Sequence, residues 1–294
     1  MTNKLLIERH ADGVAVLTFN RPGARNALDL ETMRAFAGAV ADLERDPQLR
    51  ALVVTGAGEE AFCSGGDLIE LSQYPSADDG RQMIDLMGDA LLRLERLPVP
   101  VIAAVNGYAL GGGSEIALAC DLRIVDATAR MAFVQIRMGL TPGWGAGQRL
   151  LRLVGYARAM ELLLRGTVMH APELLGYGLV NQVVEAGTAL THALHLAQHI
   201  AASPPEVVRG IKRLLQAGVN QPYESALQTE RDLFPALWAA EAHVEAVEQF
   251  LRRNSPPPPW PTGSDTLPVY GEGEQDSSND NRASYPKSDT QSRT

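Results

Sequence analysis

The stretch Ile102-Ala103-Ala104-Val105-Asn106-Gly107-Tyr108-Ala109-Leu110-Gly111-Gly112-Gly113-Ser114-Glu115 leads from an apolar, strand-like run into three consecutive glycines and a helix-forming segment. Glycines cost backbone entropy in any ordered element, so three in a row indicate that another group approaches the main chain closely. The start of a helix leaves backbone N–H groups without partners and carries a positive dipole end. This turn is therefore suited to negative charge, either a phosphate or the oxygen of a polarised carbonyl.

The glycine run does not match a nucleotide-binding motif. No Gly-Lys-Ser/Thr follows it, and Glu115 and Ile116 break the order of a dinucleotide fingerprint. A tight strand–helix connection without a ligand remains one interpretation. A second turn, Ser64-Gly65-Gly66, follows the strand-like run Ala51–Gly56 and favours the alternative, a site for a negatively charged group. Two turns at two strand ends could each give one N–H to the same oxygen.

Composition limits the class of protein. The chain has 294 residues, is 45% hydrophobic and carries a net charge of −9, which argues against nucleic-acid and anionic-membrane partners. It has no apolar run of membrane-spanning length, and its two cysteines make no disulfide framework, so we expect a cytoplasmic protein. His195 and His199 have helical spacing but no carboxylate completes a site, so we expect no metal.

Apolar runs alternate with helical patterns through the first half of the chain. Expected strands are 14–19, 52–55, 101–105 and 122–125, and expected helices are 30–45, 82–97 and 114–120. This alternation predicts an α/β fold with a mainly parallel sheet. Residues 72–80 are expected to form a loop, the chain beyond Gly147 to be rich in helices, and the proline-rich, polar tail 255–294 to be disordered.

Several motifs together resemble the enoyl-CoA hydratase/isomerase (crotonase) superfamily over residues 5–253. They are Asn20-Arg21-Pro22, Asn26-Ala27-Leu28, Ala61–Leu68, Asn106–Glu115 and Gly139–Gly145. The resemblance implies a crotonase-like spiral of ββα units with a helical C-terminal region. Residues 1–200 would form the acyl-CoA-binding core and residues 201–254 a helical trimerisation region, giving a homotrimer or hexamer.

The same resemblance implies roles for individual residues. The N–H groups of Gly66 and Gly112 would form an oxyanion hole for the thioester oxygen of an acyl-CoA. Ala24, Arg25 and Ser64 would contact the CoA nucleotide, and Asp67 and Leu68 would lie beside the pantetheine channel. Gly111 belongs to the same turn as Gly112 and would also contact the substrate. Trp144 is either a wall of the substrate site or a residue of the apolar core. No cofactor is implied, because CoA is part of the substrate.

Side-chain chemistry separates the members of this superfamily. Hydratases use two glutamates; Glu115 matches one of them, whereas the other position holds Gln135, an amide that does not exchange protons near neutral pH. Phe133–Gly139 and Pro142–Gly145 are similar to the ethylmalonyl-CoA decarboxylase branch. We therefore expect an acyl-CoA lyase that decarboxylates a short alkylmalonyl-CoA, with Glu115 as proton donor. An enoyl-CoA hydratase or isomerase, or a non-catalytic acyl-CoA- or RNA-binding protein, remains the alternative.

Overall fold

A computed structural model of the chain describes residues 4–252. The chain divides into two units, residues 1–244 and 245–294, and everything below concerns the first unit unless stated otherwise. The expected disordered tail 255–294 lies outside the described residues, and the expected boundary at residue 200 remains a prediction.

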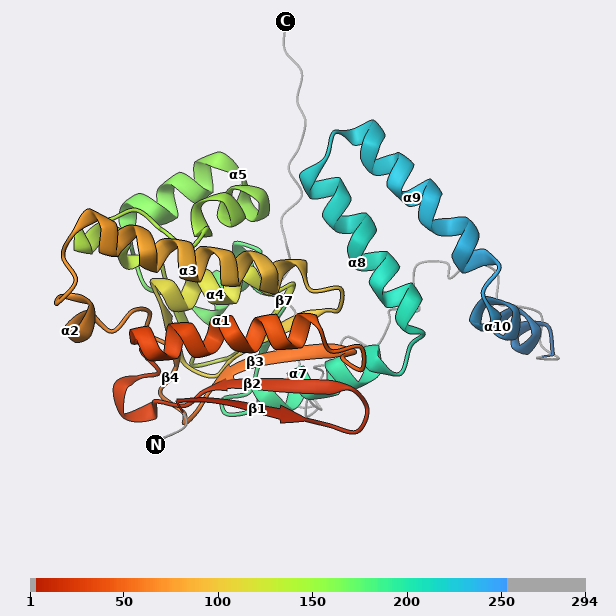
Figure 1. Cartoon of the computed structure of the whole chain (residues 1–294), viewed down its shortest axis with the longest axis horizontal. Coiled ribbons are helices and arrows are strands. Elements are labelled where there is room, and N and C mark those ends of the chain that lie inside the picture. The colour runs from red at the N-terminus through yellow and green to blue at the C-terminus, as the bar shows by residue number, and fades with distance from the viewer. Residues whose placement is uncertain (1–3, 253–294) are drawn as a thin grey trace, which may run out of the picture. The chain divides into compact units, whose positions relative to one another are not determined.

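A six-stranded sheet forms the centre of the unit, in the order β1-β2-β3-β5-β7-β10 (Figure 1). All neighbours are parallel except β1 and β2, which pair Leu5 with Phe19 as an antiparallel edge. The strands are β1 Leu5–Arg9, β2 Val14–Phe19, β3 Ala51–Gly56, β5 Val101–Val105, β7 Leu122–Asp126 and β10 Gln182–Val184. The parallel strands are almost wholly apolar because helices cover both faces of the sheet.

Two separate apolar cores lie on the two faces. Alternate strand residues such as Val53 and Ile102 pack against a row of alanines in α7, whereas their neighbours Leu52 and Ala103 pack beneath α1, α3 and α4. Figure 1 shows α1 and α3 lying side by side over the sheet. These helices are α1 Leu30–Glu44, α3 Ala77–Arg96, α4 Gly112–Ala119 and α7 Ala189–Ala201.

A second, smaller sheet has four strands in the order β4-β6-β8-β9. Three of them, β4, β6 and β8, each follow a strand of the larger sheet in the chain. The strands of the smaller sheet are β4 Ala61–Cys63, β6 Tyr108–Leu110, β8 Arg130–Ala132 and β9 Met169–His170. Both glycine turns follow directly from it, since Ser64 succeeds β4 and Gly111 succeeds β6. Because β4 and β6 pair in parallel, their carboxyl ends, and hence the two turns, lie at the same edge.

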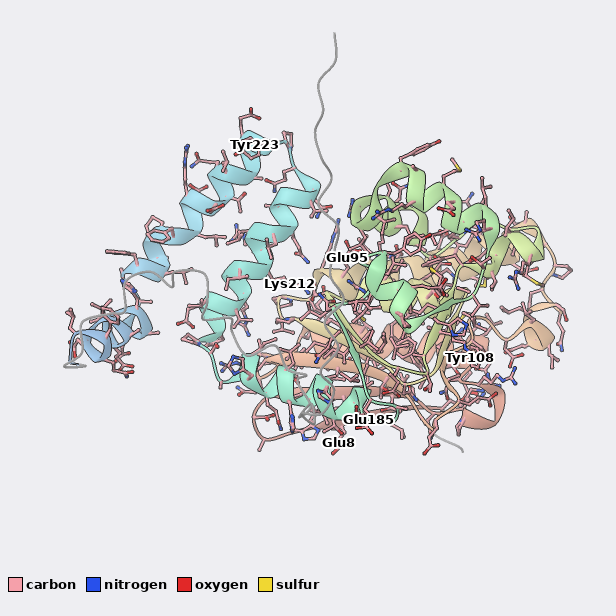
Figure 2. All side chains as sticks on the ribbon, turned by 180° about the vertical axis from the view of Figure 1, so that it is seen from behind. Glu8, Glu95, Tyr108, Glu185, Lys212 and Tyr223 are labelled. Carbon is pink, nitrogen blue, oxygen red and sulfur yellow. The ribbon has the colours of Figure 1, made fainter. Side chains whose placement is uncertain are left out.

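The remaining elements are short connections and C-terminal helices. They comprise two 3-10 helices, Pro22–Ala24 and Val134–Met138, and the helices α2 Leu68–Leu71, α5 Ala146–Arg165, α6 Ala171–Gly176, α8 Pro205–Asn220, α9 Tyr223–Trp238 and α10 Glu241–Arg252. Helices α8 and α9 pack against each other. Lys212 ties α8 to the sheet by donating to Asp121 Oδ2 at 2.6 Å and to the carbonyl of Val99 at 2.9 Å (Figure 2).

Several sequence-based boundaries were wrong. The expected loop 72–80 contains the start of α3, which begins at Ala77 because Ser76 and Asp79 form a capping box. Within α5 the backbone is non-helical at Gly155 (φ +75°), so the helical stretches suggested by the sequence at 149–154 and 157–165 are both present and are separated by a kink. The fold class itself is as expected, an α/β spiral with a helical C-terminal region.

Candidate active site

The two glycine turns lie in contact with each other. A Cβ atom placed on Gly65 would lie 3.1 Å from the amide nitrogen of Gly112 and 3.0 Å from the carbonyl oxygen of Leu110. Gly65 has φ +95° and Gly111 φ +52°, values that favour glycine. Within residues 4–252, the N–H groups of Gly66 and Gly112 donate no hydrogen bond to another protein group. Two free donors therefore lie on neighbouring turns, one of them at the N-terminus of α4.

Glu115 lies one turn into α4 and is 2% exposed. Its Oε2 accepts hydrogen bonds from the backbone N–H groups of Trp144 at 2.8 Å and Ala146 at 3.0 Å. Its Oε1 accepts from the Gln135 side chain at 2.9 Å and from the Gly143 N–H at 3.4 Å. The loop before α5 thus forms a cradle of three backbone donors around a single carboxyl group.

Burial dominates the acidity of Glu115. Desolvation raises its pKa above the ordinary value, and the hydrogen bonds from Ala146, Trp144, Gln135 and Gly143 oppose that rise without cancelling it. A carboxyl group with a raised pKa inside a closed, hydrogen-bonded site can hold and deliver a proton. Such perturbed groups are concentrated at functional sites.

Gln135 reaches the site from the 3-10 helix Val134–Met138. Its Nε2 donates to Glu115, whereas its Oε1 is buried and has no hydrogen-bond partner among the described residues. A Cβ atom on Gly111 would lie 4.0 Å from the same Nε2, so Gln135 also adjoins the glycine turn. Leaving a buried amide oxygen without a partner is costly, so this position is suited to a hydrogen-bond donor from water or a substrate.

Trp144 forms a wall of the site beside Gly112. A Cβ atom on Gly112 would lie only 2.1 Å from Cζ3 of the indole ring, so no larger residue fits there. The ring is 5% exposed. The backbone of Trp144 donates to Glu115, as described above, and its carbonyl accepts a hydrogen bond from Arg149 Nη1 at 2.7 Å.

The N-terminal turn that carries Ala24 and Arg25 lies against the first glycine turn. The Ser64 N–H donates to the Arg25 carbonyl at 3.0 Å, and the Leu28 N–H donates to the Gly65 carbonyl at 2.8 Å. Arg25 has φ +51° and an exposed side chain that pairs with Glu60 at 2.5 Å. Asp67 accepts from Arg21 at 3.0 Å and caps α2, and Leu68 is 58% exposed.

Comparisons with known proteins agree with this geometry. A sequence model described as enoyl-CoA hydratase/isomerase matches residues 9–260. The chain belongs to the enoyl-CoA hydratase/isomerase family. It is 37% identical to the short-chain-enoyl-CoA hydratase of Clostridium acetobutylicum, over 85% of this chain and 95% of that one. It is 34% identical to the ethylmalonyl-CoA decarboxylase of Xenopus laevis, over 82% and 81% of the two chains.

Solved structures of this family share the fold. The enoyl-CoA hydratase of Bacillus anthracis superposes with a TM-score of 0.81 at 31% identity, covering 86% of this chain and 98% of that one. Membership of the crotonase superfamily therefore confirms the resemblance found in the sequence. The chain is an enzyme-family member whose fold and family are consistent with an acyl-CoA substrate.

The structure brings the predicted residues of this family site together. Gly111, Gly112, Glu115, Gln135 and Trp144 form one contact network, and the turn bearing Ala24 and Arg25 reaches it through Ser64 and Gly65. Asp67 and Leu68 follow the first turn directly. The catalytic and CoA-binding roles of all these residues remain predictions.

Sequence reasoning quoted Asn26 only as part of a motif and did not find Arg149, although both side chains hold the site residues in place. The buried Asn26 side chain binds the carbonyls of Ala57 and Ala61 at 3.0 and 2.7 Å, which fixes the N-terminal turn. Arg149 fixes the loop that carries Trp144. In the sequence, neither an asparagine in the N-terminal turn nor an arginine just after a glycine loop indicates such a role. Their contacts become visible only in the structure.

Other candidate reactive groups are buried or dispersed. Burial raises the pKa of both Cys63 and Cys120 to about 12, so neither is a ready nucleophile. Among the described residues, no group of three or more acidic, histidine or cysteine side chains could hold a metal ion. The same part of the chain contains no helix that is long and apolar enough to cross a membrane.

Proposed function

We propose that this protein is an acyl-CoA lyase that stabilises a thioester enolate between the N–H groups of Gly66 and Gly112. The favoured reaction is decarboxylation of a short alkylmalonyl-CoA of the methylmalonyl or ethylmalonyl type. One observation carries the choice of reaction: the only side chain that hydrogen-bonds to the Glu115 carboxyl within residues 4–252 is Gln135, whose amide oxygen lacks a partner there.

An amide suits a substrate that brings its own negative charge. A protonated Glu115 can donate to an amide oxygen, and turning the Gln135 amide over presents its oxygen to Oε1 of Glu115. The NH₂ group of Gln135 then takes the place of the Gln135 amide oxygen, which has no hydrogen-bond partner in the present orientation. There it can donate to the carboxylate of the substrate, which a glutamate at position 135 would repel.

The proposed reaction balances with a single proton. The bond between the α-carbon and the substrate carboxylate breaks, CO₂ leaves, and the electron pair becomes the thioester enolate. The two backbone N–H groups stabilise the enolate oxygen, because charge develops there only as the bond breaks. Glu115 then gives its proton to the α-carbon and recovers one from solvent. The raised pKa of Glu115 favours the protonated form that this step needs.

Hydration is the second candidate, because the Clostridium and Syntrophomonas relatives, at 37% and 36% identity, are named as short-chain-enoyl-CoA and crotonyl-CoA hydratases. In that reaction Glu115 would act on water. Gln135 could orient the water but could not exchange a proton with it. Isomerisation of a 3-enoyl-CoA, which needs only one acid–base group, is a variant of the same site chemistry.

A small acyl-CoA panel tests the proposal. The purified chain is incubated with methylmalonyl-CoA, ethylmalonyl-CoA, crotonyl-CoA and a 3-enoyl-CoA, and products are identified by mass spectrometry with separate measurement of CO₂. We expect CO₂ and a saturated acyl-CoA from the malonyl-type thioesters, with little hydration of crotonyl-CoA. Rapid hydration of crotonyl-CoA without CO₂ release from either malonyl-type substrate would reject the decarboxylase assignment.

A further inference from the structure

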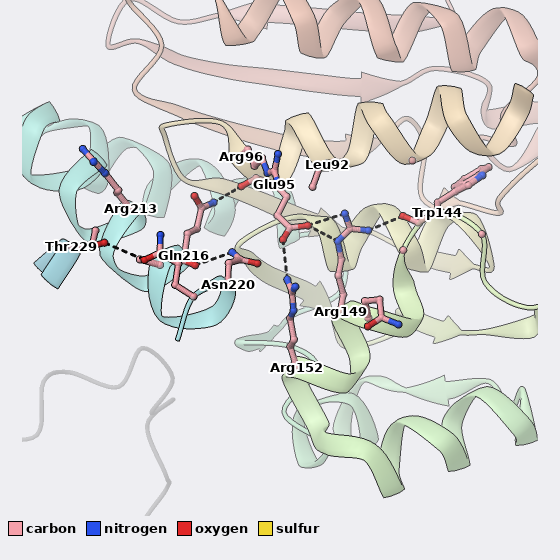
Figure 3. A pocket seen from close by; sticks show the side chains of 16 residues that line it. Leu92, Glu95, Arg96, Trp144, Arg149, Arg152, Arg213, Gln216, Asn220 and Thr229 are labelled. Atoms are coloured by element: carbon pink, nitrogen blue, oxygen red, sulfur yellow. Dashed lines mark hydrogen bonds and ion pairs between the residues drawn. The ribbon is translucent and has the colours of Figure 1, made fainter. Parts of the chain in front are cut away.

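A cavity lies beside the loop that carries Trp144. It has a volume of about 830 Å³, is open to solvent on one side and is lined by residues of α3, α5, α8 and α9 together with Gly143–Gly145 (Figure 3). Cavities of this size accommodate small-molecule ligands. Its walls are rich in amides and arginines, which distinguishes it from an apolar acyl-chain pocket.

The charge of this cavity is opposite to that of the chain. Its charged lining residues are four arginines and one glutamate, Arg96, Arg149, Arg152, Arg213 and Glu95, whereas the whole chain carries a net charge of −9. Glu95 accepts from Nε and Nη2 of the buried Arg149, both at 2.8 Å, and lies 3.6 Å from Arg152. Figure 3 shows these three side chains converging.

The remaining positive charge is not compensated. Arg96 and Arg213 form no ion pair with any group in residues 4–252. Neutral donors are also available, since Gln148, Gln216 and Asn220 line the same space. Gln216 and Asn220 are already ordered, by hydrogen bonds to the carbonyls of Glu95 at 2.6 Å and Gln216 at 2.8 Å.

We propose that this cavity binds a small anion that carries two or more carboxylate or phosphate groups. Arg96, Arg152 and Arg213 come from three different helices, α3, α5 and α8, so an anion with several acidic groups can be contacted from several sides of the cavity. Guanidinium groups bind carboxylate and phosphate oxygens in a two-pronged manner, which gives specificity as well as affinity. The cavity adjoins the proposed acyl-CoA site at Trp144, but anion binding in it does not depend on the proposed reaction.

Trp144 provides a built-in reporter of this site. It lines the cavity, and the same Arg149 that is fixed by Glu95 donates to its carbonyl. An anion that attracts Arg152 or Arg149 will change the field around the indole. The chain has three tryptophans, so the double variant Trp238→Phe/Trp260→Phe leaves Trp144 as the only one.

Fluorescence titration of that full-length double variant tests the proposal, with citrate and inorganic pyrophosphate as probes and sodium chloride at matched ionic strength as reference. We expect a saturable change with the multivalent anions and none with chloride. Adding Arg96→Ser and Arg213→Ser should weaken binding by roughly tenfold or more, as two charge-assisted contacts are lost. The matched control, Arg34→Ser/Arg231→Ser, changes the net charge equally but lies outside the cavity lining.

Three results would overturn the anion site. One is a response that chloride reproduces at equal ionic strength, and another is equal weakening by the control pair. The third is displacement of the anion by saturating CoA, which would assign the cavity to the acyl-CoA itself. Isothermal titration calorimetry repeats each comparison without relying on fluorescence, with all three tryptophans kept in the chain and in its arginine variants. None of these results bears on CO₂ release, so the cavity and the proposed reaction succeed or fail separately.

Discussion

The side-chain amide of Gln135 donates a 2.9 Å hydrogen bond to Oε1 of Glu115. This pair places a neutral group where a second carboxylate would make the site a two-acid system. Two carboxyl groups at such a distance cannot both ionise, whereas an acid and an amide can coexist in either protonation state of the acid. The identity of residue 135 therefore controls which charges the site can accept.

The substitution Gln135→Glu should change the reaction. A carboxylate at this position repels the carboxylate of a malonyl-type substrate and can exchange protons with water. We expect decarboxylation to fall by about tenfold or more and crotonyl-CoA hydration to rise, each measured as kcat/KM. Gln135→Ala serves as the control, because it removes the amide without adding an acid. If Gln135→Glu and Gln135→Ala had the same effect on both reactions, charge at this position would not select the reaction.

The pH profile tests the role of Glu115. Burial raises its pKa above 4.5, and a proton donor works only while it is protonated. Decarboxylation should therefore be constant below the raised pKa and fall by about tenfold per pH unit above it. A general base at Glu115 would give the opposite slope, with activity increasing as pH rises. Glu115→Gln should lower turnover by roughly 10²- to 10⁴-fold and abolish this limb of the profile, while CoA binding is retained.

The same shift affects stability. Because the folded-state pKa of Glu115 lies above the unfolded value, its contribution to stability is fully present below pH 4.5 and is lost as the pH rises through the raised pKa. Urea unfolding between pH 4 and 8 should show a smaller loss of stability with rising pH in Glu115→Gln than in the original chain.

Gly112→Ala should damage both structure and turnover. The added methyl group would lie 2.1 Å from Cζ3 of Trp144, so the ring and the loop that binds Glu115 must shift. We expect a loss of about 1–3 kcal/mol in the free energy of unfolding, as for other overpacked sites, and a larger fall in kcat than in CoA affinity. Gly38→Ala, in α1 with nothing within 4 Å of the new methyl group, is the matched control. It should stabilise the chain by roughly 0.5–1 kcal/mol.

The central strands and the glycine turns could be predicted from the sequence because their residue types, apolar runs and consecutive glycines, favour these structures locally. Val14–Phe19 is a nearly continuous apolar run that ends before Asn20 and Pro22. Asp29, a residue type that favours helix N-caps, directly precedes α1, and its side chain accepts a hydrogen bond from the Thr32 N–H. Strand β1 was missed because Glu8 and Arg9 obscure its pattern; as an edge strand it needs only one apolar face.

The immediate surroundings of Glu115 could not be predicted in the same way. Most of the donors that hold it are main-chain N–H groups of residues 143, 144 and 146, and a backbone donor has no side-chain signature. Gly145 adopts φ +103° so that the loop can turn towards Glu115, and only the fold shows which carboxyl group that turn meets. The contact of Trp144 with Gly112 likewise depends on the packing of α4 against α5.

Glu95 and Arg149 should act as positioning residues for the cradle. Glu95 fixes Arg149, Arg149 binds the Trp144 carbonyl, and the N–H of Trp144 binds Glu115. Arg149→Met should loosen the loop and weaken the donors that oppose the effect of burial, so the pKa read from the pH profile should rise. Arg149→Lys keeps the charge and one donor and should restore part of the original profile. A drop in stability with an unchanged pH profile would mean that Arg149 only supports the fold.

Lys212 should anchor α8 to the sheet through an ion pair between a buried lysine and the half-buried Asp121. The lysine is 7% exposed and binds Asp121 and the Val99 carbonyl, while burial raises the pKa of Asp121 against the opposing effect of Lys212. Lys212→Met leaves the Asp121 carboxylate, which is 28% exposed, without its cation, so the free energy of unfolding should fall by about 1–3 kcal/mol at pH 7. Adding Asp121→Asn to Lys212→Met removes the unpaired negative charge. The asparagine keeps an oxygen that can accept from the Val101 N–H, which now donates to Asp121 Oδ2 at 2.7 Å. The double variant should therefore be more stable than Lys212→Met alone in urea unfolding, with a difference that shrinks towards acidic pH as Asp121 takes up its proton. Equal stability of the two variants at pH 7 would show that water reaches Asp121 when the lysine is removed, and that the hold on α8 comes from its apolar contacts instead.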